Sequence, residues 1–225
     1  MTKKNLITTL RASAALAAIT TEYGIGYEDA RTSGLATATT SNKLTASAGA
    51  FVVNGVSVGD IVKNVTAGTF ALVTAVDSAT ALSLSADIFS DTDEYAIYTN
   101  HGLQLPNVYE SMLAVLDVTA AATDAGDTLD VYLDTSFDGG LTWFNIGHFT
   151  QVLGNGGAKK LLMSFKANPI AASNCVVATT DQSAGAALQV GFGDRFRYRA
   201  ACANTSTVNN SFTFSLTLIG NRAYR

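Results

Sequence analysis

Strict alternation of apolar and polar residues is the feature that most constrains the fold of this 225-residue chain. In the segment 128–134, Leu129, Val131 and Leu133 fall on one face of an extended chain and polar residues on the other. The segment 212–218 alternates in the same way between apolar and hydroxyl-bearing residues. Because successive side chains of a strand point to opposite faces, each segment predicts a strand with one buried face.

Segments of this kind continue through the C-terminal half of the chain and predict an antiparallel β-sandwich of the jelly-roll type over residues 101–225. The expected strands are 111–119, 128–135, 142–151, 159–166, 187–192, 195–203 and 211–219. Polar and glycine-containing turns separate them. No amphipathic helical run follows residue 30, so the predicted fold class is all-β.

Residues 46–100 form a second region with shorter segments rich in β-branched and aromatic residues. The strands expected there are 51–53, 61–65, 69–76, 81–85 and 94–98. Turn signals such as Asn54-Gly55 separate them. Short strands at this spacing predict a small β-barrel-like module. We place the domain boundary in the segment 101–108, which contains Pro106.

Residues 1–45 are expected to form an N-terminal helix followed by an extended arm. Ala and Leu, which favour helix, are frequent in residues 8–19, and Gly24 and Gly26 are expected to end the helix. Residues 32–50 lack helical periodicity and are expected to be an extended arm or linker. The basic start and short apolar run resemble a signal peptide. Because Arg11 interrupts the apolar run, we expect the segment to be retained in the protein.

Charged residues make up only 14% of the chain, and the formal net charge is −4. Soluble domains average about 25% charged residues. An acidic chain lacks the basic surface that binds nucleic acid, and no apolar run is long enough to predict a transmembrane helix. A surface so poor in charge is expected to be covered by neighbouring subunits, most of all in residues 34–58 and 167–193, where charges are scarcest.

Residues suited to catalysis or metal binding are few and scattered. The two histidines, His101 and His148, lie in the boundary segment and in a predicted strand, where a lone histidine is usually a satisfied structural residue. Cys175 and Cys202 lack a second pair at zinc-site spacing. They are expected to be buried thiols, with a disulfide between neighbouring strands as the lesser alternative. We therefore expect no catalytic, cofactor-binding or metal-binding residues, and a chain that is not an enzyme.

Five aspartates occur between residues 124 and 138, and a cluster of carboxylates can form a calcium site. Calcium takes about six to eight oxygen ligands, several of them from one turn. The carboxylates here alternate along a predicted strand instead, so we interpret them as a solvated strand face. The aspartates concerned are Asp124, Asp127, Asp130, Asp134 and Asp138.

The most specific local motif is S-x-D-x-G-x-T-W, made by Ser136, Asp138, Gly140, Thr142 and Trp143. It resembles the Asp-box of sialidases and other β-propellers, but it occurs once here. We expect a hairpin turn in which the aspartate accepts backbone N–H bonds, the glycines adopt positive φ and the tryptophan folds back as an apolar plug. The resemblance implies this turn and no glycosidase activity.

Three arginines share one face of the predicted strand 195–203 and form a candidate contact face. They are Arg195, Arg197 and Arg199, and they alternate with the aromatic residues Phe196 and Tyr198. Since alternating residues lie on opposite faces, the aromatic pair is expected in the core.

The two β regions together resemble structural proteins of tailed-bacteriophage virions. The segments that carry the resemblance are 58–62, 73–77, 82–85, 127–136, 138–143, 148–151, 193–199 and 211–214. It extends over most of residues 50–220. The resemblance implies assembly in the cytoplasm of a bacterial host and incorporation into the virion, without a cofactor.

The leading expectation is a capsid decoration or cement protein that bridges neighbouring subunits of a phage head. It is expected to form a symmetric homo-oligomer, with a trimer favoured, to contact other virion proteins such as the major capsid protein, and to dock through residues 1–45. One alternative is a neck, collar or tail component. Another is a carbohydrate-binding or receptor-binding β-module, which the Asp-box and an exposed Tyr132 suggest.

Overall fold

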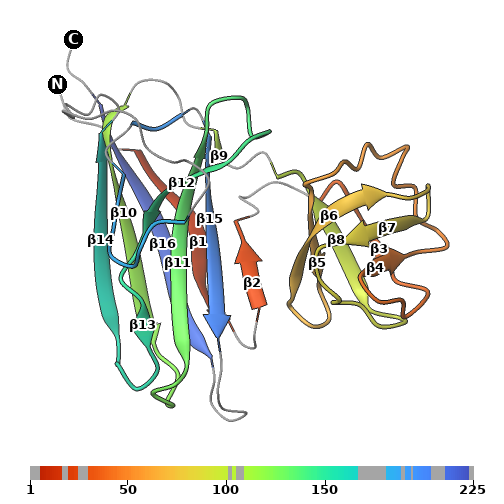
Figure 1. Cartoon of the computed structure of the whole chain (residues 1–225), viewed down its shortest axis with the longest axis horizontal. Coiled ribbons are helices and arrows are strands. Elements are labelled where there is room, and N and C mark those ends of the chain that lie inside the picture. The colour runs from red at the N-terminus through yellow and green to blue at the C-terminus, as the bar shows by residue number, and fades with distance from the viewer. Residues whose placement is uncertain are drawn as a thin grey trace. The chain divides into compact units, whose positions relative to one another are not determined.

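The structure, a computed structural model, describes residues 6–16, 20–24, 30–100, 103–104, 109–166, 181–188, 191–193, 195–203 and 211–222. Within these ranges the secondary structure is entirely β, which confirms the predicted fold class. The chain divides into two compact units. The smaller unit is Thr21–Asn100, and the larger unit combines Met1–Thr20 with His101–Arg225. The smaller unit is therefore an insertion in the sequence of the larger one (Figure 1).

The first sheet of the larger unit is antiparallel and has the strand order β1-β16-β10-β14. Its strands are β1 (Leu6–Leu16), β16 (Phe212–Arg222), β10 (Tyr109–Ala120) and β14 (Lys159–Lys166). β16 and β10 are the central strands, so β1 and β14 form the two edges. Inward and outward side chains alternate along β16 as predicted, with Phe214 and Leu216 fully buried.

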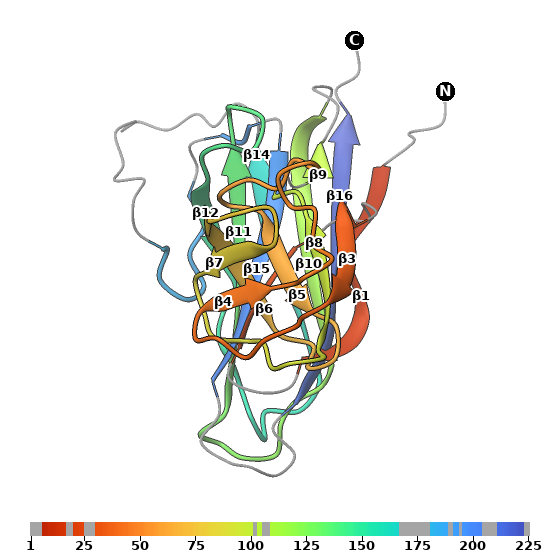
Figure 2. The same ribbon diagram turned by 90° about the vertical axis from the view of Figure 1, so that its right-hand side faces the viewer.

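The second sheet has the order β12-β11-β15-β2. These strands are β12 (Phe144–His148), β11 (Thr128–Ser136), β15 (Arg195–Ala203) and β2 (Thr20–Tyr23). Two short strands extend it, since β13 (Val152–Leu153) pairs with β11 and β9 (Leu103–Gln104) pairs with β15. Figures 1 and 2 show the two sheets as separate layers.

One hydrophobic core joins the two layers, as expected of a β-sandwich. Leu129, Val131 and Leu133 of β11 belong to the same buried cluster as Met112 and Leu116 of β10. Phe196 and Tyr198 of β15 are also buried in this cluster, as the alternation predicted.

The smaller unit is a curled, half-barrel sheet with the order β3-β8-β5-β6-β7-β4. Its strands are β3 (Thr32–Leu35), β8 (Glu94–Tyr98), β5 (Ile61–Asn64), β6 (Phe70–Val76), β7 (Ala81–Leu84) and β4 (Lys43–Thr45). A bridge between Ala38 and Thr45 links the chain after β3 to β4. Phe51, Leu44 and Ile97 are fully buried in the core of this unit.

The predicted N-terminal helix is wrong for residues 8–16, which lie in β1. β1 pairs with β16 from Leu6↔Gly220 to Leu16↔Phe212, and two register shifts interrupt the pairing. Helix propensity is a weak preference that tertiary contacts override. Here the ladder bonds to β16 and the burial of Leu10 and Leu16 outweigh it.

The extended arm expected before residue 46 also differs from the structure, because its described residues 32–35 and 43–45 form strands of the smaller unit. They pair with β8 and β7. Several other expectations concern residues outside the described ranges. These are residues 17–19, Gly26, His101, Pro106, Cys175 and most of the charge-poor stretch 167–193.

Candidate functional site

The outer face of the second sheet carries a row of charged residues across β11 and β15. In the antiparallel register Asp134 lies opposite Arg197, and Tyr132 lies opposite Arg199. Residues directly opposite each other in a ladder share a face. The predicted arginine face and the predicted aspartate face are therefore one surface, and we call it the polar face.

Asp134 is the centre of the polar face. Its Oδ2 accepts hydrogen bonds from Nε of Arg197 at 2.9 Å and from Nε of Arg199 at 2.7 Å. Nη2 of Arg199 donates to Oδ1 at 3.0 Å, so Arg199 binds the carboxylate with two nitrogens. Nδ2 of Asn145 donates to the same oxygen at 3.0 Å. The carboxylate is thus surrounded by donors and has an exposed fraction of only 1%.

Burial by itself raises the pKa of Asp134, because it disfavours the charged form. The hydrogen bond and charge of Arg199, followed by the charge of Arg197, outweigh this effect and lower the pKa below its ordinary value. Arg199 shows the reciprocal result, since its bonds to Asp134 and Asp181 outweigh its own desolvation and raise its pKa. Asp134 and Arg199 are therefore both ionised at neutral pH.

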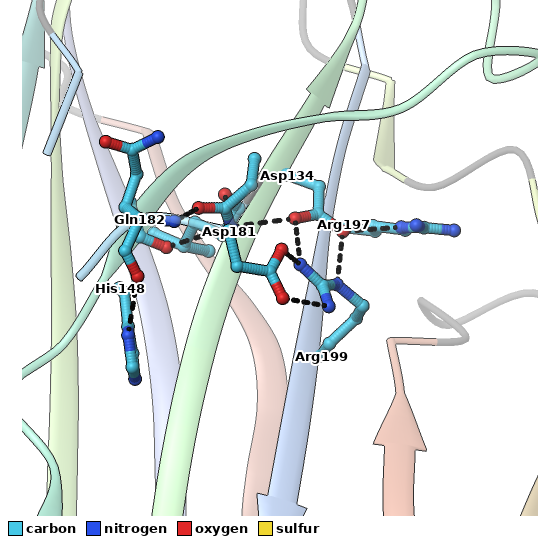
Figure 3. Close-up of polar contacts among 9 residues, drawn as sticks. Asp134, His148, Asp181, Gln182, Arg197 and Arg199 are labelled. Carbon is cyan, nitrogen blue, oxygen red and sulfur yellow. Dashed lines mark hydrogen bonds and ion pairs between the residues drawn. The ribbon is translucent and has the colours of Figure 1, made fainter. Parts of the chain in front are cut away.

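Residues 181–188, which we call the strap, contact this cluster from a distant part of the sequence (Figure 3). Nη2 of Arg199 donates to Oδ1 of Asp181 at 2.6 Å. The backbone N–H of Gln182 donates to Oδ1 of Asn145 at 2.9 Å. The strap then pairs with the edge strand β12, where N–H of His148 donates to the carbonyl of Ala186 at 2.9 Å. It therefore closes the polar face beside β12.

His148 is held between two hydrogen-bond acceptors. Its Nδ1 lies 2.9 Å from the carbonyl oxygen of Gln182, and its Nε2 lies 2.8 Å from Oδ1 of Asp130. In a Ser–His–Asp triad, one imidazole nitrogen faces the nucleophile instead. His148 is thus a satisfied strand residue that fixes the strap, in agreement with its interpretation from the sequence.

The aromatic rings of the polar face are covered by cations and by His148. The imidazole of His148 stacks on Tyr132 with ring centroids 4.1 Å apart, and the Arg199 guanidinium lies 4.7 Å from the same ring centre. Because β12 and β15 flank β11 on opposite sides, these contacts cover both faces of the tyrosine. The guanidinium of Arg197 lies 4.6 Å from the centre of the Trp143 ring.

The Asp-box-like segment forms the hairpin between β11 and β12, as predicted. Oδ1 of Asp138 accepts the backbone N–H groups of Leu141 and Thr142 at 3.1 and 2.8 Å. Oγ of Ser136 donates to the same carboxylate oxygen and accepts from N–H of Gly140 at 2.9 Å. The φ angles of Gly139 and Gly140 are 77° and 98°, which favours glycine at both positions.

Trp143 differs from the apolar plug expected of this hairpin. Its ring is half-buried against the Arg197 guanidinium, and its buried Nε1 has no hydrogen-bond partner among the residues that the structure describes. Two apolar side chains of the turn, Phe137 and Leu141, remain exposed. The turn is therefore held by Ser136 and Asp138 rather than by the tryptophan.

We predict that Asp138 stabilises the larger unit only above strongly acidic pH. The hydrogen bond from the Thr142 backbone, then the Ser136 side chain, lowers the pKa of Asp138 to about 2. The unfolded pKa is about 3.9, so the stabilisation is complete above that pH and disappears as the pH falls through about 2.

A carboxyl NMR titration is expected to give Asp138 a midpoint near 2. The difference in melting temperature between the wild type and Asp138→Asn should be constant above about pH 4.5 and shrink in stronger acid. A titration midpoint close to the unfolded value would contradict this geometry.

The other sequence-predicted residues occupy different environments. The solvated-face interpretation is wrong for Asp127 and Asp134, which are buried, whereas Asp124 and Asp138 are exposed. Arg195 is half-buried, and its backbone carbonyl accepts a bond from Oγ1 of Thr135 at 2.9 Å. Burial, then the charge of Asp127, raises the pKa of the Cys202 thiol to about 11.

Sequence reasoning missed three members of the cluster, namely Asn145, Asp181 and Gln182. Nothing in the local pattern distinguishes them, because their contacts depend on strand register and on a strap from elsewhere in the chain. Within the described ranges, no group of three or more His, Cys, Asp or Glu side chains is placed to hold a metal ion. The same part of the chain contains no helix long and apolar enough to cross a membrane.

No protein-family model matches the sequence, and no curated protein matches it.

Proposed function

We propose that this chain is a non-enzymatic structural protein of a tailed-bacteriophage virion, and within that class a capsid decoration or cement protein. The proposal that the chain is not an enzyme depends on one observation, which is that the charged side chains of the polar face are engaged with one another. Its carboxylates, arginines and histidine bind one another and the strap, as ion pairs within a fold do. The virion role itself is supported by the sequence resemblance.

The proposed mechanism is mechanical. Each β unit has its own hydrophobic core, so one chain offers two folded bodies to neighbouring subunits. Only 14% of the residues are charged. Covering the surface of the chain with neighbouring subunits therefore removes few charges from water and has a small desolvation cost. In this proposal the chain is located in the virion as a homo-oligomer, binds the major capsid protein and neighbouring copies, and thereby reinforces the shell.

The carbohydrate-binding alternative is less well supported. Sugar-binding modules offer open aromatic faces and convergent polar groups, as ligand sites generally do. Here His148 and Arg199 cover both faces of Tyr132, and Arg197 covers Trp143. These contacts favour a structural use of the Asp-box hairpin over recognition of a glycan.

Imaging of labelled chain in purified particles tests the proposal. A decoration protein is expected at regular positions over the head, in fixed proportion to the major capsid protein. Label confined to a ring on the tail axis would instead support the neck, collar or tail alternative. Particles without the chain would contradict a virion role altogether.

A further inference from the structure

The outer face of the first sheet carries two adjacent rows of uncharged side chains. The pairing of β1, β16, β10 and β14 fixes these rows, because opposite residues share a face. Six of their residues, which we call the apolar face, are Ile7, Ile219 and Leu113 in one row and Thr217, Val115 and Leu162 in the next.

The most exposed members of the apolar face lie at the two edges of the sheet. Ile7 on β1 is 67% exposed, and Leu162 on β14 is 64% exposed. Leu113, Val115 and Ile219 lie between them and are half-buried. Contiguous exposed apolar side chains of this kind usually mark an interaction surface.

Charged groups border the apolar face instead of entering it. Beyond the second row, Nζ of Lys160 forms an ion pair with Asp117 at 2.9 Å. Beyond the first row, Lys166 lies opposite Ser111. An uncharged centre with a polar border is the usual composition of a protein–protein interface.

We propose that the apolar face is a two-fold contact through which two copies of this chain pack sheet against sheet. Four strands spaced about 4.8 Å apart, each contributing about eight residues of about 3.4 Å, give the whole outer face of the sheet a footprint of about 500 Å², of which the two rows of the apolar face are about half. The accessible area of protruding side chains exceeds this flat footprint, which brings the contact towards the roughly 800 Å² per partner of a standard interface. A dimer contact therefore uses the whole outer face of the sheet, with the apolar face as its centre and the charged border as its rim.

The arrangement of the rows favours one symmetry. A two-fold axis parallel to the strands places β1 of one copy over β14 of the other, so Ile7 meets Leu162 of the second copy. Because the two residues belong to neighbouring rows, their side chains interdigitate rather than collide. An axis across the strands would instead place Lys160 over Lys166 of the second copy, which brings like charges together.

This inference rests on the proposed function only for the existence of a homo-oligomer: it names the surface of self-association and proposes a dimer in place of the trimer favoured from the sequence. It is tested on the purified full chain, so it can fail while the virion role holds. Conversely, dimerisation of the purified chain can be observed even if the chain proves to be absent from virions.

Sedimentation velocity of the full chain, with circular dichroism to verify folding, tests the proposal. The wild type is expected to dimerise. Ile7→Lys and Leu162→Glu should each raise the dissociation constant at least about tenfold, because each places an unpaired charge in the contact. Combining both substitutions should restore dimerisation, since the new lysine then faces the new glutamate of the second copy.

Val53→Glu is the matched control, because Val53 is 85% exposed and lies in the smaller unit. This variant should dimerise like the wild type. A monomeric or trimeric wild type would overturn the proposal, and so would single variants that retain full dimerisation. Failure of the double variant to recover would overturn the axis parallel to the strands.

Discussion

Replacing Asp134 with asparagine is expected to lower the free energy of unfolding of the larger unit by about 3–5 kcal/mol, as when one member of a buried ion pair is removed. The substitution keeps the shape of the side chain but removes its charge. Asparagine retains only one acceptor oxygen, so the two Nε atoms that share Oδ2 and the Nη2 of Arg199 that uses Oδ1 cannot all keep their acceptor. Both guanidiniums remain largely buried, with exposed fractions of 11% and 19%, so water compensates them poorly.

Tryptophan fluorescence during urea unfolding measures the stability of the larger unit, because Trp143 is the only tryptophan of the chain and lies in that unit. Asp124→Asn is the matched control, since Asp124 is exposed and its loss should change stability by less than about 0.5 kcal/mol. Folding lowers the pKa of Asp134. The difference in free energy of unfolding between the wild type and the variant should therefore be complete above the ordinary aspartate pKa and disappear as the pH falls below it. A loss below about 1 kcal/mol at neutral pH would show that water reaches Asp134.

Phe214→Ala is expected to destabilise the same unit by a similar amount, about 3–5 kcal/mol. Phe214 is fully buried in β16, between the pairing partners β1 and β10. The Arg11 guanidinium of β1 lies 3.8 Å from its ring centre, and Nη1 of Arg11 donates to its carbonyl at 2.6 Å. Truncation therefore leaves a cavity in the core and removes the ring against which a buried arginine packs.

Thr213→Ala is the control for this variant, because Thr213 is the adjacent outward residue and is half-buried. Its effect should stay below about 1 kcal/mol. The same tryptophan signal reports both variants. Equal effects of the two substitutions would contradict the assignment of Phe214 to the core and of Thr213 to the outer face.

The alternating segments were predictable because burial of one face leaves a period of two in the sequence. The range predicted for β15, 195–203, agrees with the structure, and β11 was predicted to within one residue. β1 was not predictable in this way. Four consecutive exposed residues, 12–15, follow the buried Arg11, so the register shifts remove the alternation and leave an alanine-rich composition that favours helix.

The polar face was only partly predictable for a related reason. Alternation places Asp134 and Arg197 on outward faces, but it does not reveal what covers an outward face. Asn145 contacts Asp134 directly, and the strap contacts Asn145 and Arg199. These contacts depend on strand order and join residues that are 11, 37 and 18 positions apart in the sequence. The hairpin at Asp138 was predictable because its hydrogen bonds are local.

The copy number of the chain in purified phage particles tests the central claim most directly. Quantitative mass spectrometry of particles from the host that produces this chain is expected to detect it in fixed proportion to the major capsid protein. The proportion should persist after washing in high salt, because the proposed contacts are largely uncharged. Absence of the chain from particles, with the folded protein found free in the lysate, would contradict the account.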